Sequence, residues 1–181
     1  EGENDTENIG VAVFKDDKLV GELNGLESIC HLIVTNKMEN CMITIPSPFE
    51  PNGIINLQLQ LSKNTQNNVN VSNGSPLISC SVYLEGNIIS SSNNVDYSSK
   101  ENLELIEKYA NAYIEGLISQ YLYKTSKEFQ SDIVGFGKYL RDGYLTWEDW
   151  EKYDWLSKYQ NSFFDVTVKT SVKAGELFLR Y

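Results

Sequence analysis

The stretch IINLQLQLSK, residues 54–63, carries the clearest secondary-structure signal in the chain. Apolar and polar residues alternate without interruption over 55–62. The apolar set is Ile55, Leu57, Leu59 and Leu61. A period of two is typical of a β-strand with one buried and one solvent-facing side. The sequence therefore predicts a sheet with one covered face, of which this is the clearest strand.

The segments on either side of this strand extend the predicted sheet. Residues 64–76, NTQNNVNVSNGSP, are Asn-rich and uncharged and predict a hairpin connection or a mobile loop, with the tightest turn at the Asn-Gly pair 73–74. A second alternating run over 78–84 predicts a strand that pairs antiparallel with the first. Upstream, three of the four prolines lie in 46–53 and predict a turn-rich connection after a short strand over 41–45.

The N-terminal part of the chain predicts a hairpin and a short helix. Residues 1–8 are a polar, acidic leader. Two short apolar runs, 9–14 and 18–23, flank an Asp-containing turn and predict a β-hairpin. Apolar residues at helical spacing over 26–37 then predict a short amphipathic helix.

The longest helical pattern begins where Ser98 and Glu101 have the spacing of a capping box. Apolar residues three or four positions apart share one face, and they predict a helix that runs to about residue 130 and packs across the sheet. The set is Leu103, Ile106, Ala110, Tyr113, Leu117 and Tyr121. Gly116, in the middle of this helix, marks either a close approach to a neighbour or a bend.

After a break at 131–137 the helical pattern restarts. Thr146 is the predicted N-cap of a further helix over 146–159, because acids follow it in the first turn. Alternation over 164–169 predicts one or two closing strands, with a turn near 174–175.

This order of elements predicts the α+β class, with an antiparallel or mixed β-sheet packed against a long α-helix and shorter helices. The length of 181 residues is typical of one domain. We therefore predict a polar leader over 1–8 and a single domain over 9–181.

The charge of the chain argues against several classes of partner. Twenty-five acidic residues against fifteen basic ones give a formal net charge of −10, which repels nucleic-acid phosphates and anionic lipid headgroups. Four acids crowd into 148–154, where they indicate a solvated helix face or, alternatively, a contact for a cationic partner. No run reaches the roughly 18 apolar residues of a membrane-spanning helix. The chain begins at Glu1 without a signal peptide, which suggests an excised domain whose targeting segment lies upstream.

The sequence predicts no catalytic, cofactor-binding or metal-binding residues. The three cysteines, Cys30, Cys41 and Cys80, form neither a CxxC pair nor a disulfide framework. The one histidine, His31, lacks further ligands at metal-binding spacing and is predicted to be structural. The GFG run at 135–137 follows a helix and lacks a third glycine, so it is not a phosphate-binding loop.

Three tryptophans, Trp147, Trp150 and Trp155, have two interpretations. They can form an aromatic cage that binds a ligand beside the acids of 148–154, or they can anchor the core, which the helical spacing favours. The first interpretation defines a rival hypothesis, an extracellular ligand-binding or hydrolytic domain that uses residues 147–155 as its pocket.

Two segments resemble a known family, the C subunits of nutrient germinant receptors in spore-forming bacteria (Ger(x)C). They are VAVFKDDKLVGEL with the following GLES, residues 11–28, and KEFQSDIVGFGKYL, residues 127–140. The most specific piece is the D-I-x-G-F-G block, and its signature residues are Asp132, Ile133, Gly135, Phe136 and Gly137. We expect these residues to be architectural, with Asp132 tying a helix over 133–140 and Phe136 filling the core. The region 46–76 matches nothing in the family.

The resemblance covers the chain from about residue 9 to residue 180 and corresponds to the family's C-terminal domain. It implies a non-enzymatic accessory domain of a lipoprotein on the outer face of the spore inner membrane. The family's lipid anchor sits on an N-terminal cysteine that this chain lacks, so the chain itself is expected to be soluble. The implied partners are the membrane-embedded A and B subunits of the receptor, reached by protein–protein contacts.

Overall fold

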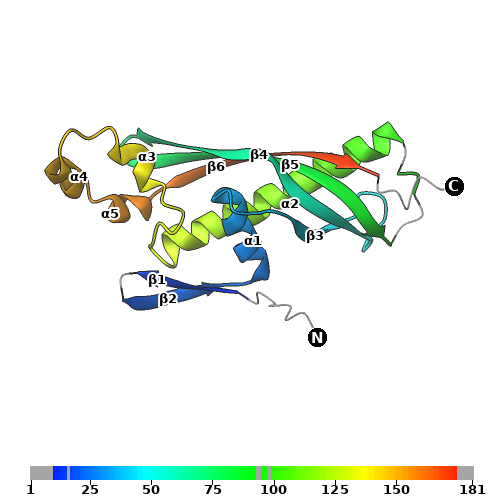
Figure 1. The fold of residues 1–181 in the computed structure, drawn as a ribbon, viewed down its shortest axis with the longest axis horizontal. Coiled ribbons are helices and arrows are strands. Elements are labelled where there is room, and N and C mark those ends of the chain that lie inside the picture. Colours follow the sequence, from blue (N-terminus) through cyan, green and yellow to red (C-terminus); the bar gives the residue numbers. More distant parts are fainter. Residues whose placement is uncertain (1–9, 16, 93–94, 98, 175–181) are drawn as a thin grey trace, which may run out of the picture.

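The computed structural model describes residues 10–15, 17–92, 95–97 and 99–174. Within them the chain forms two sheets and five helices, arranged along an elongated molecule (Figure 1). The elements in order are β1 (Val11–Lys15), β2 (Lys18–Leu23), α1 (Gly25–Val34), β3 (Cys41–Pro46), β4 (Ile54–Ser72), β5 (Ser75–Ser91), α2 (Lys100–Lys127), α3 (Gly137–Arg141), α4 (Trp147–Tyr153), α5 (Trp155–Tyr159) and β6 (Phe163–Lys173). The predicted α+β class is confirmed.

The main sheet has the strand order β3-β4-β5-β6. The first three strands pair antiparallel, while β6 runs parallel to β5 and completes the sheet as its last strand. The residues that alternate in the sequence, such as Leu57 and Leu59, are fully buried on one face. Helix α2 lies along that sheet, and α3, α4 and α5 gather at one end of it (Figure 1).

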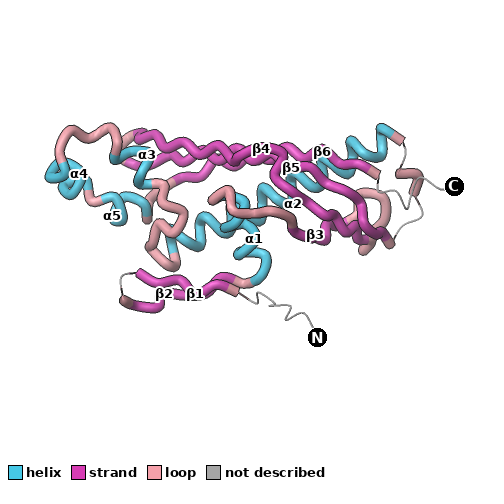
Figure 2. Tube along the Cα trace, viewed as in Figure 1, coloured by secondary structure: helices cyan, strands magenta, loops and turns pink. Residues whose placement is uncertain are grey.

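Most of the Asn-rich segment is a strand, so the prediction that a loop or hairpin connection spans 64–76 is wrong in extent, while the predicted turn at 73–74 and the hairpin it joins are confirmed. Residues 64–72 continue β4, and only the Asn-Gly pair 73–74 turns, with both residues at positive φ (51° and 82°). The two strands run side by side to the turn (Figure 2). Bulges interrupt the register of their ladder between residues 61 and 66. Asparagine has a low strand propensity, but the long partner strand β5 supplies backbone hydrogen bonds that override it.

The hairpin β1–β2 confirms the first two predicted strands and forms a sheet of its own. Helix α1 begins with a capping box, in which Asn24 Oδ1 accepts from Glu27 N and Glu27 Oε2 accepts from Asn24 N. The helix ends at Val34, three residues before the predicted limit of 37, because the residues after it turn and Asn36 adopts positive φ.

Helix α2 differs from its prediction at both ends. It begins at Lys100 with Ser99 as N-cap, and the Ser99 side chain makes no capping hydrogen bond, while Ser98 lies outside the described residues. It ends at Lys127, which gives 28 residues and a length of about 42 Å. An added Cβ at Gly116 would meet nothing within 4 Å, so this glycine does not mark a close approach.

The buried stripe of α2 is also shifted by part of a turn from the predicted one. Ile106, Ala110 and Tyr121 are buried as expected, whereas Leu103, Tyr113 and Leu117 are only partly buried. Ile114 and Ile118 complete the buried row, and among the strands of the sheet the helix packs mainly against β6. The small residue Ala110 in this row allows the helix to approach the strands closely.

Polar side chains of α2 cover the free edge of the sheet. Glu107, Asn111 and Glu115 lie four residues apart and therefore on one side of the helix. Each accepts a hydrogen bond from an outward backbone N–H of β6. The pairs are Glu115 Oε1 with Val168 N (2.9 Å), Asn111 Oδ1 with Thr170 N (2.8 Å) and Glu107 Oε1 with Val172 N (2.8 Å). The helix thus satisfies donors that an edge strand would otherwise expose.

The C-terminal part contains three short helices and one strand. Thr146 caps α4 as predicted, since its Oγ1 accepts from Asp149 N at 3.1 Å. The predicted helix over 146–159 is interrupted at Asp154, which adopts a left-handed conformation and separates α4 from α5. Strand β6 confirms the predicted alternation, and the turn near 174–175 falls at the limit of the described residues.

Candidate functional site

The signature block is held together by one carboxylate. Asp132 Oδ1 accepts from the backbone N–H groups of Gly135 and Phe136, both at 2.9 Å, and Oδ2 accepts from Gly137 N at 2.8 Å. Trp155 Nε1, which lies 23 residues further along the chain, donates to Oδ2 at 2.8 Å. Asp132 therefore holds the residues of the loop together and also links the loop to α5. The helix that follows starts at Gly137, so the predicted helix over 133–140 is shorter than expected, because residues 133–136 form turns around the carboxylate.

Packing and backbone conformation explain the identity of other signature residues. Phe136 is fully buried, and its ring centroid lies 6.4 Å from that of Tyr159. Gly135 has a φ of 81°, which side chains rarely adopt. A Cβ at Gly137 would lie 2.7 Å from Trp155 Nε1, so only glycine lets the indole reach Asp132. Ile133 is half-buried and lines a cavity described below.

The three tryptophans have different environments: core anchoring is correct for Trp155, holds in part for Trp150, which packs against the core, and is wrong for Trp147. Trp155 is buried, Trp150 is half-buried, and Trp147 is 62% exposed with its Nε1 bonded to Glu151 Oε1 at 2.6 Å. Trp150 stacks on Tyr153 and on Trp155, with centroid separations of 6.0 and 6.4 Å. Because its ring faces pack against other rings, these residues do not form the open aromatic cage of the rival hypothesis.

An exposed apolar tip lies beside these rings; the sequence pattern singled out Trp147 and the acids that follow it, but not Leu145. Leu145 is 99% exposed and Trp147 follows it at the start of α4, a helix with no buried residue. Three acids, Glu148, Asp149 and Glu151, are exposed on the same helix. We refer to residues 145–151 as the apolar tip. Two large apolar side chains surrounded by carboxylates form the kind of patch that marks a contact surface.

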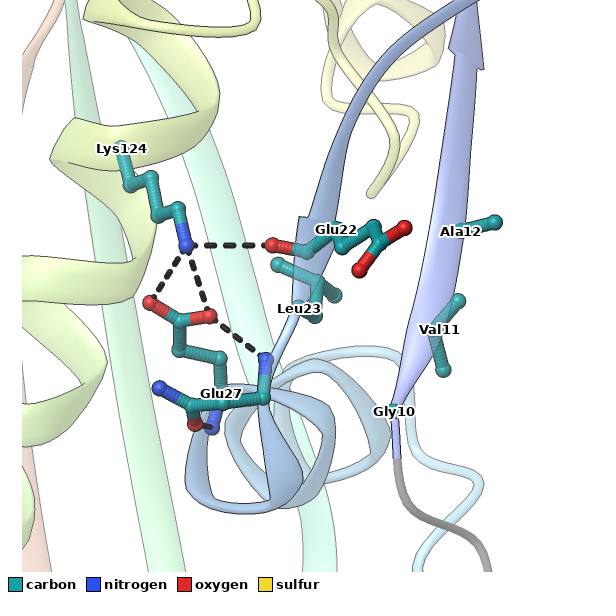
Figure 3. A pocket seen from close by; sticks show the side chains of 8 residues that line it. Gly10, Val11, Ala12, Glu22, Leu23, Glu27 and Lys124 are labelled. Carbon is teal, nitrogen blue, oxygen red and sulfur yellow. Dashed lines mark hydrogen bonds and ion pairs between the residues drawn. The ribbon is translucent and has the colours of Figure 1, made fainter.

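A second candidate lies between the hairpin and α1, where a cavity of about 580 Å³ is lined by Glu27 and Lys124 (Figure 3). Lys124 Nζ lies 2.8 Å from both carboxylate oxygens of Glu27 and donates to the Glu22 carbonyl at 3.1 Å. Glu27 also accepts from Asn24 N, so the opposite charges of Glu27 and Lys124 are already paired with each other. This arrangement acts as a clamp that joins β2, α1 and α2.

The three cysteines and the histidine are buried or half-buried, which shifts the pKa of each. Burial raises the pKa of Cys30 and of Cys80 to about 12 and that of Cys41 to about 11, and all three are free thiols. Burial, and secondarily the charge of Lys37, lower the pKa of His31 below its ordinary value. His31 Nδ1 lies 2.7 Å from the Tyr121 hydroxyl, as a structural histidine would.

Two searches of the described ranges complete the description of the site. No group of three or more His, Cys, Asp or Glu side chains in these ranges is arranged to hold a metal ion. No described helix is both long enough and apolar enough to cross a membrane.

Fold and site together define the class of this protein: an α+β domain in which one long helix covers a four-stranded sheet and one carboxylate organises the loop block at its end. Residues 9–175 match the family described as "Spore germination B3/ GerAC like, C-terminal". The chain belongs to this family and is a C-terminal domain of the Ger(x)C type.

A solved structure shares the fold. It is described as "Crystal Structure of the GerBC protein" and superposes with a TM-score of 0.72 at 19% sequence identity, over 90% of this chain and 50% of that one. The chain thus spans about half the length of the solved protein that it resembles. No curated protein sequence matches it.

Proposed function

We propose that this chain is a non-enzymatic accessory domain of a germinant-receptor lipoprotein subunit and that it acts through protein–protein contacts with the membrane-embedded A and B subunits. In the full subunit a lipid anchor, outside this chain, would hold the domain at the outer face of the spore inner membrane. The family membership supports the setting, and the apolar tip is the observation that supports the mode of action.

The tip has the composition of an interaction hot spot. Tryptophan is enriched among residues that dominate binding energy, and a leucine exposed to 99% has no role in the fold of this chain. The exposed acids beside them, such as Glu148 and Asp149, would repel an anionic lipid surface. They would instead attract a protein partner that has a basic rim around an apolar pocket.

The proposal is tested with the full-length subunit, its lipid anchor included, co-expressed with its A and B subunits. Leu145→Ser and Trp147→Ser are each expected to reduce the amount of A and B that crosslinks to the subunit by about tenfold, the effect of a hot-spot side chain. Tyr109→Ser is the matched control, because Tyr109 is an exposed aromatic residue on α2, away from the tip.

Three outcomes would contradict the proposal. The first is crosslinking of both tip variants at the wild-type level, and the second is an equal loss for Tyr109→Ser. The third is a stable subunit that never associates with A or B, which would remove the proposed mode of action altogether.

A further inference from the structure

A polar cavity of about 230 Å³ lies where three distant parts of the chain meet. The end of α1 and the turn after it form one wall, the Asn-rich half of β4 forms another, and the signature block with the start of α3 closes the third. Its functional lining residues are His31, Lys37, Asn67, Ile133, Lys138 and Tyr139. The volume equals that of roughly eight water molecules at about 30 Å³ each. A small organic molecule would fit.

The charged side chains that line this cavity are basic. Lys37 comes from the turn after α1 and Lys138 from α3, and within the described ranges neither forms an ion pair with a carboxylate. His31 adds no charge at neutral pH, because its pKa is lowered. Lys138 Nζ lies 5.0 Å from the centroid of the Tyr139 ring, a contact that leaves its charge uncompensated. In a chain with a net charge of −10, two ammonium groups without a carboxylate partner at one cavity create a local positive potential that favours an anion.

The same cavity contains a buried acceptor that nothing satisfies. Asn67 Nδ2 donates to the Val34 carbonyl at 3.0 Å, and since that carbonyl can only accept, the amide orientation is fixed. Oδ1 of Asn67 is then buried without any hydrogen-bond partner in the described protein. Burying a polar atom without a hydrogen bond costs free energy. We therefore expect a donor that is not part of the chain to bind this oxygen.

The surrounding acceptors are already used, which isolates this one. The carbonyls of His31 and Leu32 at the end of α1 accept from residues 35, 37 and 38. The amide of Asn36 makes two hydrogen bonds to Thr65 and fixes the α1 end against β4. A ligand would therefore meet two cationic donors and a single preoriented acceptor.

We propose that the polar cavity binds a small organic acid that carries a hydrogen-bond donor, a hydroxyl or an ammonium group, beside its carboxylate. The carboxylate would bind Lys37 and Lys138, and the donor would bind Asn67 Oδ1. This site is independent of the apolar tip and does not rest on the proposed function.

The test compares three acids of nearly equal size with this chain labelled with ¹⁵N. Glycolate carries a hydroxyl, glycine carries an ammonium group, and acetate carries neither. Titration at millimolar concentrations is expected to shift the Asn67 side-chain amide and the Lys138 backbone signal in a saturable way for glycolate, for glycine or for both. Acetate should bind at least about tenfold more weakly, since it leaves Oδ1 unpaired.

Charge-neutral variants show where the anion binds. Lys37→Gln and Lys138→Gln should each weaken binding by about tenfold, because each removes a charge-assisted hydrogen bond at an exposed position that the fold does not need. Lys100→Gln is the control: it removes the same charge from the exposed start of α2. Three results would overturn the proposal: no saturable shift with any of the acids, equal affinity for acetate, or equal weakening by Lys100→Gln.

Discussion

Asp132 shows how much of the loop structure depends on a single side chain. Replacement by alanine would leave three backbone N–H groups and the Trp155 indole without their acceptor. We expect Asp132→Ala to lower the free energy of unfolding by about 3 kcal/mol or more, measured by urea denaturation. Asp132→Asn keeps one acceptor oxygen and should lose less.

The control for this prediction is Asp142→Asn, at a carboxylate that is largely exposed. Its effect should stay within about 0.5 kcal/mol. An Asp132→Ala variant as stable as Asp142→Asn would mean that the four hydrogen bonds contribute nothing to the fold.

His31 predicts a pH dependence of stability. Its ordinary pKa is 6.5, and burial lowers it in the folded protein, so the unfolded chain binds the proton more readily. The free energy of unfolding should therefore fall as the pH drops below about 6.5, until the folded pKa is passed. The charge of Lys37 acts in the same direction, and Tyr121 remains neutral because burial raises its pKa.

The measurement is urea denaturation of the wild type and of His31→Gln at pH about 7 and about 5.5. Glutamine retains a hydrogen-bonding partner for the Tyr121 hydroxyl but does not titrate. The wild type should lose more stability than the variant on acidification. Identical losses in the two proteins would show that His31 is not the titrating group.

At the scale of single residues, the sequence allowed part of the site to be predicted. The D-I-x-G-F-G block indicated an architectural loop, and the carboxylate of Asp132 does bond to the residues that follow it. The contribution of Trp155 could not be predicted, because it depends on α5 folding back over the loop. The steric requirement for glycine at 137 follows from that same contact.

Among the elements, the contact between α2 and β6 makes a prediction about association. Glu107→Ala, Asn111→Ala and Glu115→Ala should each cost about 1 kcal/mol, because each leaves an N–H of β6 without a protein acceptor. The triple variant should also self-associate, measured by light scattering, because its strand edge is exposed. Glu104→Ala, at an exposed position on the same helix, should do neither.

Substitutions at two glycines, one packed and one open, test how the hairpin is attached to the rest of the chain. A Cβ at Gly21 would lie 2.2 Å from the Phe129 ring, whereas one at Gly116 would meet nothing. Gly21→Ala should destabilise the docked hairpin and accelerate hydrogen exchange in β1 and β2. Gly116→Ala should stabilise the protein by about 1 kcal/mol, because alanine is the better helix former. Unchanged exchange in Gly21→Ala would contradict the close packing against Phe129.

The elements themselves were predicted well where periodicity is strong and poorly where it is absent. The alternation in 54–63 located β4, and helical spacing located α2. The Asn-rich continuation of β4 has too few apolar residues to produce an alternating pattern. It forms a strand because it pairs with β5, which follows the turn. The bulges near Lys63 further disturb the period of two that the prediction relies on.

For the molecule as a whole, the single domain over 9–181 remains a prediction. The core is continuous, since α2 spans the sheet. The C-terminal part of α2 also contacts the hairpin, because Lys124 Nζ donates a hydrogen bond to a carbonyl of β2. Unfolding should therefore be one cooperative transition, with tryptophan fluorescence, which reports α4 and α5, coinciding with far-UV circular dichroism, which reports the sheet and α2. Two separated transitions would divide the chain into smaller folding units.

The polar cavity belongs to this largest scale, and that is why the sequence could not predict it. Its walls come from residues near 35, 67 and 135, and no local pattern links these segments. Only the bulged course of β4 past the end of α1 brings Asn67 against Val34. Sites of this kind follow from tertiary packing and leave no motif in the chain.

The side chains that α2 extends to β6 also limit how another protein can recognise this sheet. They occupy the positions where the backbone of an incoming peptide would bind, so β-augmentation on that side would have to displace three hydrogen bonds. In the part of the chain that the structure describes, β3 is the remaining terminal strand of the sheet. Its last residue, Pro46, has no N–H to donate, so a donated strand could pair with only a few residues there. The two edges of the sheet therefore differ: α2 covers the β6 edge, whereas the β3 edge could offer a partner strand only a short contact.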